Sequence, residues 1–255
     1  MFDLIWQALQ ADAFPVLAVT AVLAGMVRGF SGFGSAMILV PIASALTNPQ
    51  TAVVLLIFTD TLLTLPMVLP ALRRCVWREV LPLAAGALCT VPLGVHLLLL
   101  LDQTLLRWII SLLILVLVAL LASGWRWSRP PSLLRTTMVG GASGFTGSMA
   151  GIGGPPVILF WMAGHGGPAT IRSNIIVFFA MTGAFNLIAY FLNGLVTEER
   201  LATGVALAPL YACALLLGAR AFRLATPQFF RALAFGLCAF AAISGLPLLD
   251  GLIRG

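Results

Sequence analysis

The sequence GMVRGFSGFG at residues 25–34 decides the fold, because a related glycine-rich sequence, GFTGSMAGIG, follows at residues 144–153. A shift of 119 residues superposes three pairs of glycines: Gly25 on Gly144, Gly32 on Gly151 and Gly34 on Gly153. Glycine inside a helix costs about 1 kcal/mol relative to alanine, so repeated glycines in apolar sequence need a structural reason. Two reasons are open: a broken helix whose turn lines a site, or close packing of helices through small residues.

The composition predicts a membrane protein. The 255 residues are 61% hydrophobic and 9% charged, with a mean hydropathy of +1.09, whereas a soluble domain of this length carries far more polar residues. The net charge of +6 includes 14 arginines and no lysine, an excess that reports topology in a membrane protein. Basic residues do not alternate with aromatic ones on a polar face, which argues against nucleic-acid binding.

Two further features of the composition bear on processing and on metals. The four cysteines lie far apart in the sequence, so we expect them to be apolar packing residues and expect no metal or redox site. Asp3 and Asp12 stand where a signal peptide carries positive charge, so no cleaved signal is expected.

The chain divides into two halves with the same plan. The apolar stretch 14–46 is too short for two full spans and a turn, so it predicts a helical hairpin that turns part-way through the bilayer. Three spans then complete the first half, residues 14–123, at 50–69, 79–101 and 105–123. A basic linker, 124–135, leads to the second half, residues 136–249, with a glycine-broken hairpin at 137–164 and spans at 171–192, 201–219 and 229–249. The sequence LLR at 105–107 even recurs as FFR at 229–231.

The arginines test this plan. A hairpin returns to the side from which it started, so three spans per half make the two halves inverted repeats. With the loop at 73–78 in the cytoplasm, ten arginines lie inside and three outside, while Arg28 lies within the membrane. Counting each hairpin as one span would distribute the arginine loops over both sides, so the inverted arrangement fits the positive-inside rule better. We therefore expect an all-α, polytopic integral membrane protein whose N-terminus and C-terminus both lie outside.

The two hairpin turns are the predicted binding site. The second arm of each hairpin begins directly after its glycines, and the amide hydrogens at a helix N-terminus suit an anion. Two such N-termini that arrive from opposite faces would form a positive pocket in the middle of the membrane. Arg28 adds a full charge, and its planar fork matches sulfonate, phosphate or carboxylate oxygens. The candidate residues at the turns are Arg28, Gly32, Gly34, Ser35, Gly151, Gly153 and Gly154.

Two polar residues in the spans, Asp60 and Arg172, have two interpretations each. Asp60 lies near mid-depth and either neutralises Arg28 or serves as a proton- or substrate-coupling group. Arg172 is either a cytoplasmic topology charge or a coupling residue, and Asn174, one or two turns inside its span, is a candidate for substrate binding. For Asn186 and Asn193, hydrogen bonds to neighbouring helices are as good an interpretation as a role in the site.

These features resemble the TauE/SafE sulfite exporters, also called the 4-toluene sulfonate uptake permease group. The resemblance rests on the twin glycine hairpins at 25–41 and 144–156, the sequence from Pro168 to Phe179, and Pro92-Leu93-Gly94. It covers about residues 14–249, with two departures: Gly34-Ser35 replaces a glycine run, and 216–218 lacks the proline of 92–94. The resemblance implies transport of sulfur-containing or small organic anions, including sulfite, sulfoacetate and other sulfonates, in the bacterial inner membrane. Inverted repeats with broken helices are themselves typical of secondary transporters with alternating access.

Two alternative functions are compatible with the same residues. An anion channel would share every static feature of a carrier. An intramembrane serine protease is suggested by the Gly-x-Ser-Gly pattern at Ser31 and at Ser143, although such a nucleophile needs a histidine base within reach. We expect no catalytic residue and no cofactor. The expected partners are a small anion, the lipid bilayer, protons as a coupling ion, and a second copy of the chain if it oligomerises.

Overall fold

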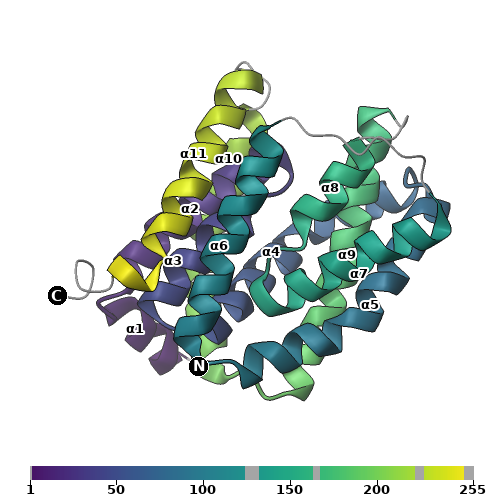
Figure 1. The fold of residues 1–255 in the computed structure, drawn as a ribbon. Coiled ribbons are helices and arrows are strands. Elements are labelled where there is room, and N and C mark those ends of the chain that lie inside the picture. Colours follow the sequence, from purple (N-terminus) through teal and green to yellow (C-terminus); the bar gives the residue numbers. More distant parts are fainter. Residues whose placement is uncertain (1, 124–131, 163–166, 222–226, 250–255) are drawn as a thin grey trace.

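The computed structural model describes residues 2–123, 132–162, 167–221 and 227–249, and throughout these residues the secondary structure is helical (Figure 1). The helices are α1 Phe2–Gln10, α2 Phe14–Ser31, α3 Ser35–Leu46, α4 Pro49–Leu72, α5 Trp77–Leu100, α6 Gln103–Ala122, α7 Leu133–Ala150, α8 Gly154–Met162, α9 Pro168–Leu192, α10 Glu198–Ala221, α11 Pro227–Ser244 and the short 3-10 helix η1 Pro247–Leu249. Four of the described helices are long and apolar enough to cross a membrane, and six spans result if each of two bent helix pairs counts as one. The expected all-α, multi-pass membrane protein is confirmed.

Both predicted hairpins are present, and glycines form their turns. α2 ends at Gly32, whose φ of +77° is left-handed and whose amide donates to the carbonyl of Arg28. Gly34, with φ +95°, precedes α3, and Gly151, with φ +72°, ends α7. Only glycine adopts these angles without strain. The broken-helix interpretation therefore holds at the ends of α2 and α7.

The other interpretation, close packing, holds at glycines earlier in the same helices. A Cβ atom at Gly25 of α2 would lie 2.7 Å from the carbonyl oxygen of Tyr211 in α10. A Cβ at Gly144 of α7 would overlap the carbonyl oxygen of Ala87 in α5. These glycines let the backbones of two helices approach each other closely. The first arm of each hairpin thus packs against a span from the other half of the sequence.

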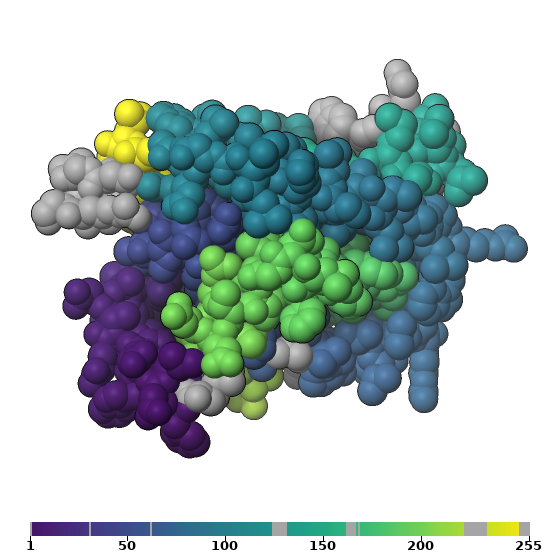
Figure 2. All heavy atoms as spheres, turned by 90° about the horizontal axis from the view of Figure 1, so that it is seen from below, coloured from purple at the N-terminus to yellow at the C-terminus, as the bar shows by residue number. Residues whose placement is uncertain are grey.

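The two close-packed pairs correspond to each other residue by residue. Tyr211 follows Ala87 by 124 residues, as Gly144 follows Gly25 by 119. The reverse contacts match too: Gly94 of α5 meets Phe145, and Gly218 of α10 meets Met26. Gly218 follows Gly94 by 124 residues, and Phe145 follows Met26 by 119. The halves are therefore interleaved: Figure 1 groups α5 with α7, α8 and α9, and groups α10 and α11 with α2, α3 and α6. In Figure 2 the green end of α9 and start of α10 lie between purple α1 and the teal helices of the first half.

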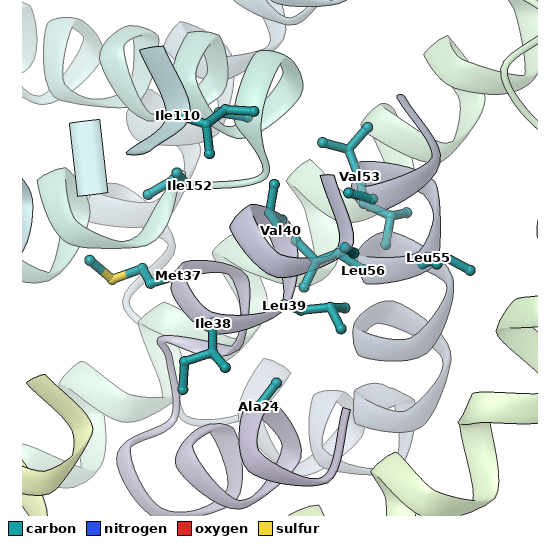
Figure 3. Close-up of a cluster of buried hydrophobic side chains, with 14 of the residues drawn as sticks. Ala24, Met37, Ile38, Leu39, Val40, Val53, Leu55, Leu56, Ile110 and Ile152 are labelled. Carbon is teal, nitrogen blue, oxygen red and sulfur yellow. The ribbon is translucent and has the colours of Figure 1, made fainter. Parts of the chain in front are cut away.

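The hydrophobic core surrounds the second arm of the first hairpin. Ile38, Leu39 and Val40 of α3 are almost completely buried, and they belong to one cluster with Leu56 and other side chains of α4 (Figure 3). Ile152, from the turn of the second hairpin, belongs to the same cluster. The core thus brings the two hairpin turns close to α4.

Three segments differ from the expected boundaries or add to them. α1 forms a bend of 94° with α2 and exposes Phe2 and Trp6. α7 begins at Leu133, so the end of the expected 124–135 linker is already helical, while 124–131 lies outside the described residues. α4 bends by 53° between Thr61 and Leu63, because Pro66 has no amide hydrogen for the carbonyl four residues earlier. This bend directly follows Asp60.

Candidate functional site

Asp60 of α4 is the residue on which polar side chains from three other helices converge. Its Oδ1 atom lies 2.9 Å from Nε of Arg28 in α2, and it accepts a hydrogen bond of 2.6 Å from the hydroxyl of Tyr211 in α10. The hydroxyl of Ser35, the first residue of α3, donates to the same oxygen at 3.4 Å. The pairing of Arg28 with Asp60 that the sequence suggested is thus present. Oδ1 carries all three contacts, whereas Oδ2 has none among the described residues.

Arg28 connects this carboxylate to the turn of its own hairpin. Its Nη1 atom donates to the carbonyl oxygen of Gly32, and its guanidinium carbon lies 5.4 Å from the ring centroid of Phe179 in α9. The side chain is 9% exposed. A buried arginine is tolerated when its donors are bonded and its charge is paired, and Asp60, Gly32 and Phe179 meet these needs from three different elements.

A cavity of about 70 Å³ lies beside Asp60, between α4, α9 and the second hairpin. α4 contributes Asp60 and Thr61 to its wall, and α9 contributes Phe179, Thr182 and Asn186. The second hairpin contributes Ser143 and four glycines: Gly144, Gly147, Gly151 and Gly153. A water molecule occupies about 30 Å³ in the liquid, so the cavity has room for a compact ligand.

The turn of the second hairpin is held by its own side chains. The hydroxyl of Ser143 donates to the carbonyl oxygen of Gly153, and that of Thr146 donates to the carbonyl of Ile152 at 2.9 Å. A Cβ atom at Gly153 would lie 2.9 Å from the carbonyl oxygen of Ser143. The turn is therefore fixed at the edge of the cavity. The hydroxyl of Ser143 thus serves to hold the turn. His96 of α5, one of the two histidines that could act as a base for a serine nucleophile, is exposed.

The helix start after this turn supplies fewer donors than the sequence suggested. α8 begins at Gly154, as expected, but its next two residues are Pro155 and Pro156. Proline has no amide hydrogen, so the first turn of α8 lacks two of the donors that a helix N-terminus normally presents. Gly154 lies where the hairpins meet, since a Cβ there would be 3.5 Å from Phe179 and 3.9 Å from Phe33.

Most of the predicted site residues lie together, but two do not. Arg28, Gly32 and Ser35 belong to the Asp60 cluster, and Gly34 precedes Ser35. Asn174 lies outside the cavity wall: its side chain is fully buried, accepts from the amide of Val76 at 2.8 Å and donates to Glu79 at 2.9 Å. Arg172 is exposed. The assignment of substrate binding to Asn174 and of coupling to Arg172 thus gains no support from contacts with the cluster.

Sequence analysis left out several residues of this site. Tyr211 and Phe179 looked like ordinary apolar residues of spans, although the 119-residue shift that relates the hairpins also relates Asp60 to Phe179. Asn186, by contrast, was noticed as a residue for bonds between helices, yet its Oδ1 atom is buried without a partner. Among the described residues no group of His, Cys, Asp and Glu is arranged to hold a metal ion.

A comparison with protein families fits this architecture. A family model described as sulfite exporter TauE/SafE matches residues 17–245, which include both hairpins, the Asp60 cluster and the cavity. No curated protein and no solved structure matches the chain. The family match extends over most of the 255 residues, and the chain therefore belongs to the TauE/SafE sulfite exporter family.

Proposed function

We propose that the chain is a secondary transporter that moves sulfite, sulfoacetate or another small sulfonate or organic anion, bound beside Arg28 between the two hairpin turns. The observation that carries the proposal is the buried Arg28–Asp60 pair next to a cavity lined by the glycines of the second turn. Membership in an exporter family makes the chain a membrane anion transporter and indicates transport in place of catalysis.

The pairing of Arg28 suggests how an anion binds. Asp60 now neutralises the guanidinium through a single carboxylate oxygen. An incoming sulfite or sulfonate presents several oxygens in a geometry that a guanidinium binds with two parallel hydrogen bonds. The anion would thus replace Asp60 on Arg28 from the side of the cavity.

A proton is the coupling ion that this arrangement favours. With the anion on Arg28, the Asp60 carboxylate would be a second negative charge beside a single positive one. Two negative charges that lie side by side favour protonation of one of them. Asp60 would therefore take up a proton when the anion binds and lose it when the anion leaves, so that anion and proton move together.

Alternating access would come from the two halves, 14–123 and 136–249, arranged as inverted repeats in the bacterial inner membrane. The residue-by-residue match between the α2–α10 and α5–α7 contacts supports such repeats. Transporters of this design bind their substrate at the repeat interface, where broken helices meet, and expose it to one side at a time. The contact between Phe33, Gly154 and Phe179 lies where the two turns meet.

Transport by proteoliposomes tests the proposal. The purified chain should take up radiolabelled sulfite with saturation, should exchange external label for internal unlabelled sulfite, and should respond to a pH gradient. Uptake that never saturates and shows no exchange would identify a channel. If neither sulfite, sulfoacetate nor a simple carboxylate moves, the proposal is wrong.

A further inference from the structure

The side-chain oxygen of Asn186, Oδ1, is a buried polar atom that the described residues leave without a hydrogen-bond partner. The side chain is 6% exposed and lines the cavity beside Asp60. Two other buried side-chain oxygens of the described residues, Oγ of Ser44 and Oγ of Ser111, lack partners. Neither serine belongs to the cavity wall.

The unpaired state of this oxygen is costly. An asparagine side chain can make up to four hydrogen bonds, and a buried amide oxygen that accepts none loses its hydration without compensation. The other asparagine of α9 shows the usual outcome, since Asn174 bonds to Val76 and Glu79. A buried polar group with no partner in the protein is one that a ligand can satisfy.

The amide also has an open path to the cavity. Gly147, one turn before the end of α7, lies opposite: a Cβ atom there would be 4.0 Å from Nδ2 of Asn186 and 3.4 Å from Cα of Gly153. Because Gly147 has no side chain, this space stays free. Asp60 forms another part of the same wall.

We propose that Asn186 binds the transported anion directly, with its Nδ2–H group donating to one anion oxygen and its Oδ1 atom accepting from a protonated one, as in hydrogensulfite. This inference rests on the proposed function, because it assigns a ligand contact within the same site. The cavity of about 70 Å³ is several times smaller than the pockets of ~300 Å³ or more that hold drug-sized ligands. A compact oxyanion of a few heavy atoms fits this volume, with Asn186 and Asp60 in the cavity wall and Arg28 behind Asp60.

The test compares Asn186→Leu with the wild-type protein, using sulfite as the probe. Leucine has nearly the same volume and no polar atom, so the thermal stability of the ligand-free protein should stay the same or rise. The affinity for sulfite, measured by thermal shift and by proteoliposome uptake, should fall about tenfold or more, because a hydrogen bond to a charged group is lost. Ser111→Ala removes an unpartnered hydroxyl away from the cavity. It should change neither the thermal shift caused by sulfite nor the uptake of sulfite.

The outcomes separate this inference from the proposed function. If sulfite and sulfoacetate stabilise the wild-type protein, and Asn186→Leu binds them equally well, the inference is wrong and the transporter proposal stands. If no anion stabilises or crosses with the wild-type protein, both are wrong. Asn186→Ala removes the amide and adds no bulk, so it should fold even if the leucine variant does not, and it should also bind sulfite about tenfold or more weakly. Normal binding by Asn186→Ala would also overturn the inference.

Discussion

Gly147 occupies in the second half of the chain the position that Arg28 occupies in the first, at the same 119-residue shift that relates the hairpin glycines. The partner of Arg28, Asp60, corresponds in the same way to Phe179. The first half thus fills the space between hairpin and span with an ion pair. The second half leaves that space open as the cavity that Gly147 and Phe179 line. The cavity arises from this difference between two otherwise related halves.

Arg28 should not be replaceable by lysine. Its guanidinium contacts Asp60 and the carbonyl of Gly32 at once and lies over Phe179, whereas an ammonium is a point charge without a planar fork. We expect Arg28→Lys to reduce sulfite uptake by about tenfold or more. Initial rates in proteoliposomes, compared at equal protein incorporation, measure this effect. Wild-type rates would show that Arg28 serves only to pair with Asp60.

The double variant of Arg28→Ala and Asp60→Ala separates stability from transport. Removing one partner of a buried ion pair costs about 3–5 kcal/mol, and the cost is smaller here because Asp60 is 21% exposed. Arg28→Ala should therefore melt at a lower temperature than the wild-type protein, and Asp60→Ala should restore part of the loss. Transport should stay absent in the double variant. Restored transport would contradict a role of Arg28 in binding.

Gly147→Ala should weaken sulfite binding without disturbing the fold. The added methyl group would make ordinary contacts of 3.4 Å and 4.0 Å, and alanine favours a helix over glycine by about 1 kcal/mol. The methyl group nevertheless occupies space in the cavity. Gly141→Ala on the same helix is the control, since its methyl group would meet Thr90 at 3.4 Å, away from the cavity wall. Equal sulfite affinity in both variants would place the anion elsewhere.

Asn174→Ala should lower the stability of the fold and leave the affinity for sulfite unchanged, the opposite of what is expected for Gly147→Ala. The amide connects the amide hydrogen of Val76 to the carboxylate of Glu79, which also accepts from Trp161. Leaving these groups unsatisfied should cost about 1–3 kcal/mol, measured by thermal unfolding. A variant that keeps its stability and loses sulfite affinity would restore Asn174 as the binding residue that the sequence suggested.

Cysteine labelling tests the orientation in the membrane. In a background without the native cysteines, Arg74→Cys should react with an impermeant maleimide from the cytoplasmic side, and Gln103→Cys should react from outside; both positions are exposed. The native Cys75 is a weaker reporter, because burial raises the pKa of its thiol and a smaller thiolate fraction reacts more slowly. Labelling of position 74 from outside alone would reverse the proposed topology.

The hairpins were predictable from the sequence, whereas the choice of polar partners was not. Left-handed glycines at positions 32 and 151 follow from local rules, because glycine adopts the left-handed conformation that commonly ends a helix. Asn174 and Asn186 are both single asparagines in one apolar helix. Their neighbours, Glu79 in one case and an empty cavity in the other, come from elements far away in the sequence. A single sequence contains no information on which of the two amide oxygens remains unpaired.

The dual use of the glycines was also hidden. Gly25 packs against α10, while Gly32 forms a turn, and both belong to the same motif. The two interpretations therefore looked exclusive although each is correct at its own positions. A glycine serves close packing where a neighbouring backbone crosses the helix, and the position of that crossing is set by the packing of the whole bundle.

The interleaving of the halves has a consequence for synthesis. When the ribosome has completed α6, the close partner of α5, namely α7, has not yet been made, and α2 still lacks α10. The glycine-lined backbone faces of α2 and α5, at Gly25 and at Gly86, remain in contact with lipid until the second half inserts. The first half alone is thus an unfinished structure in the bilayer, and a stop codon in the connection between the halves would leave a product for quality-control proteases.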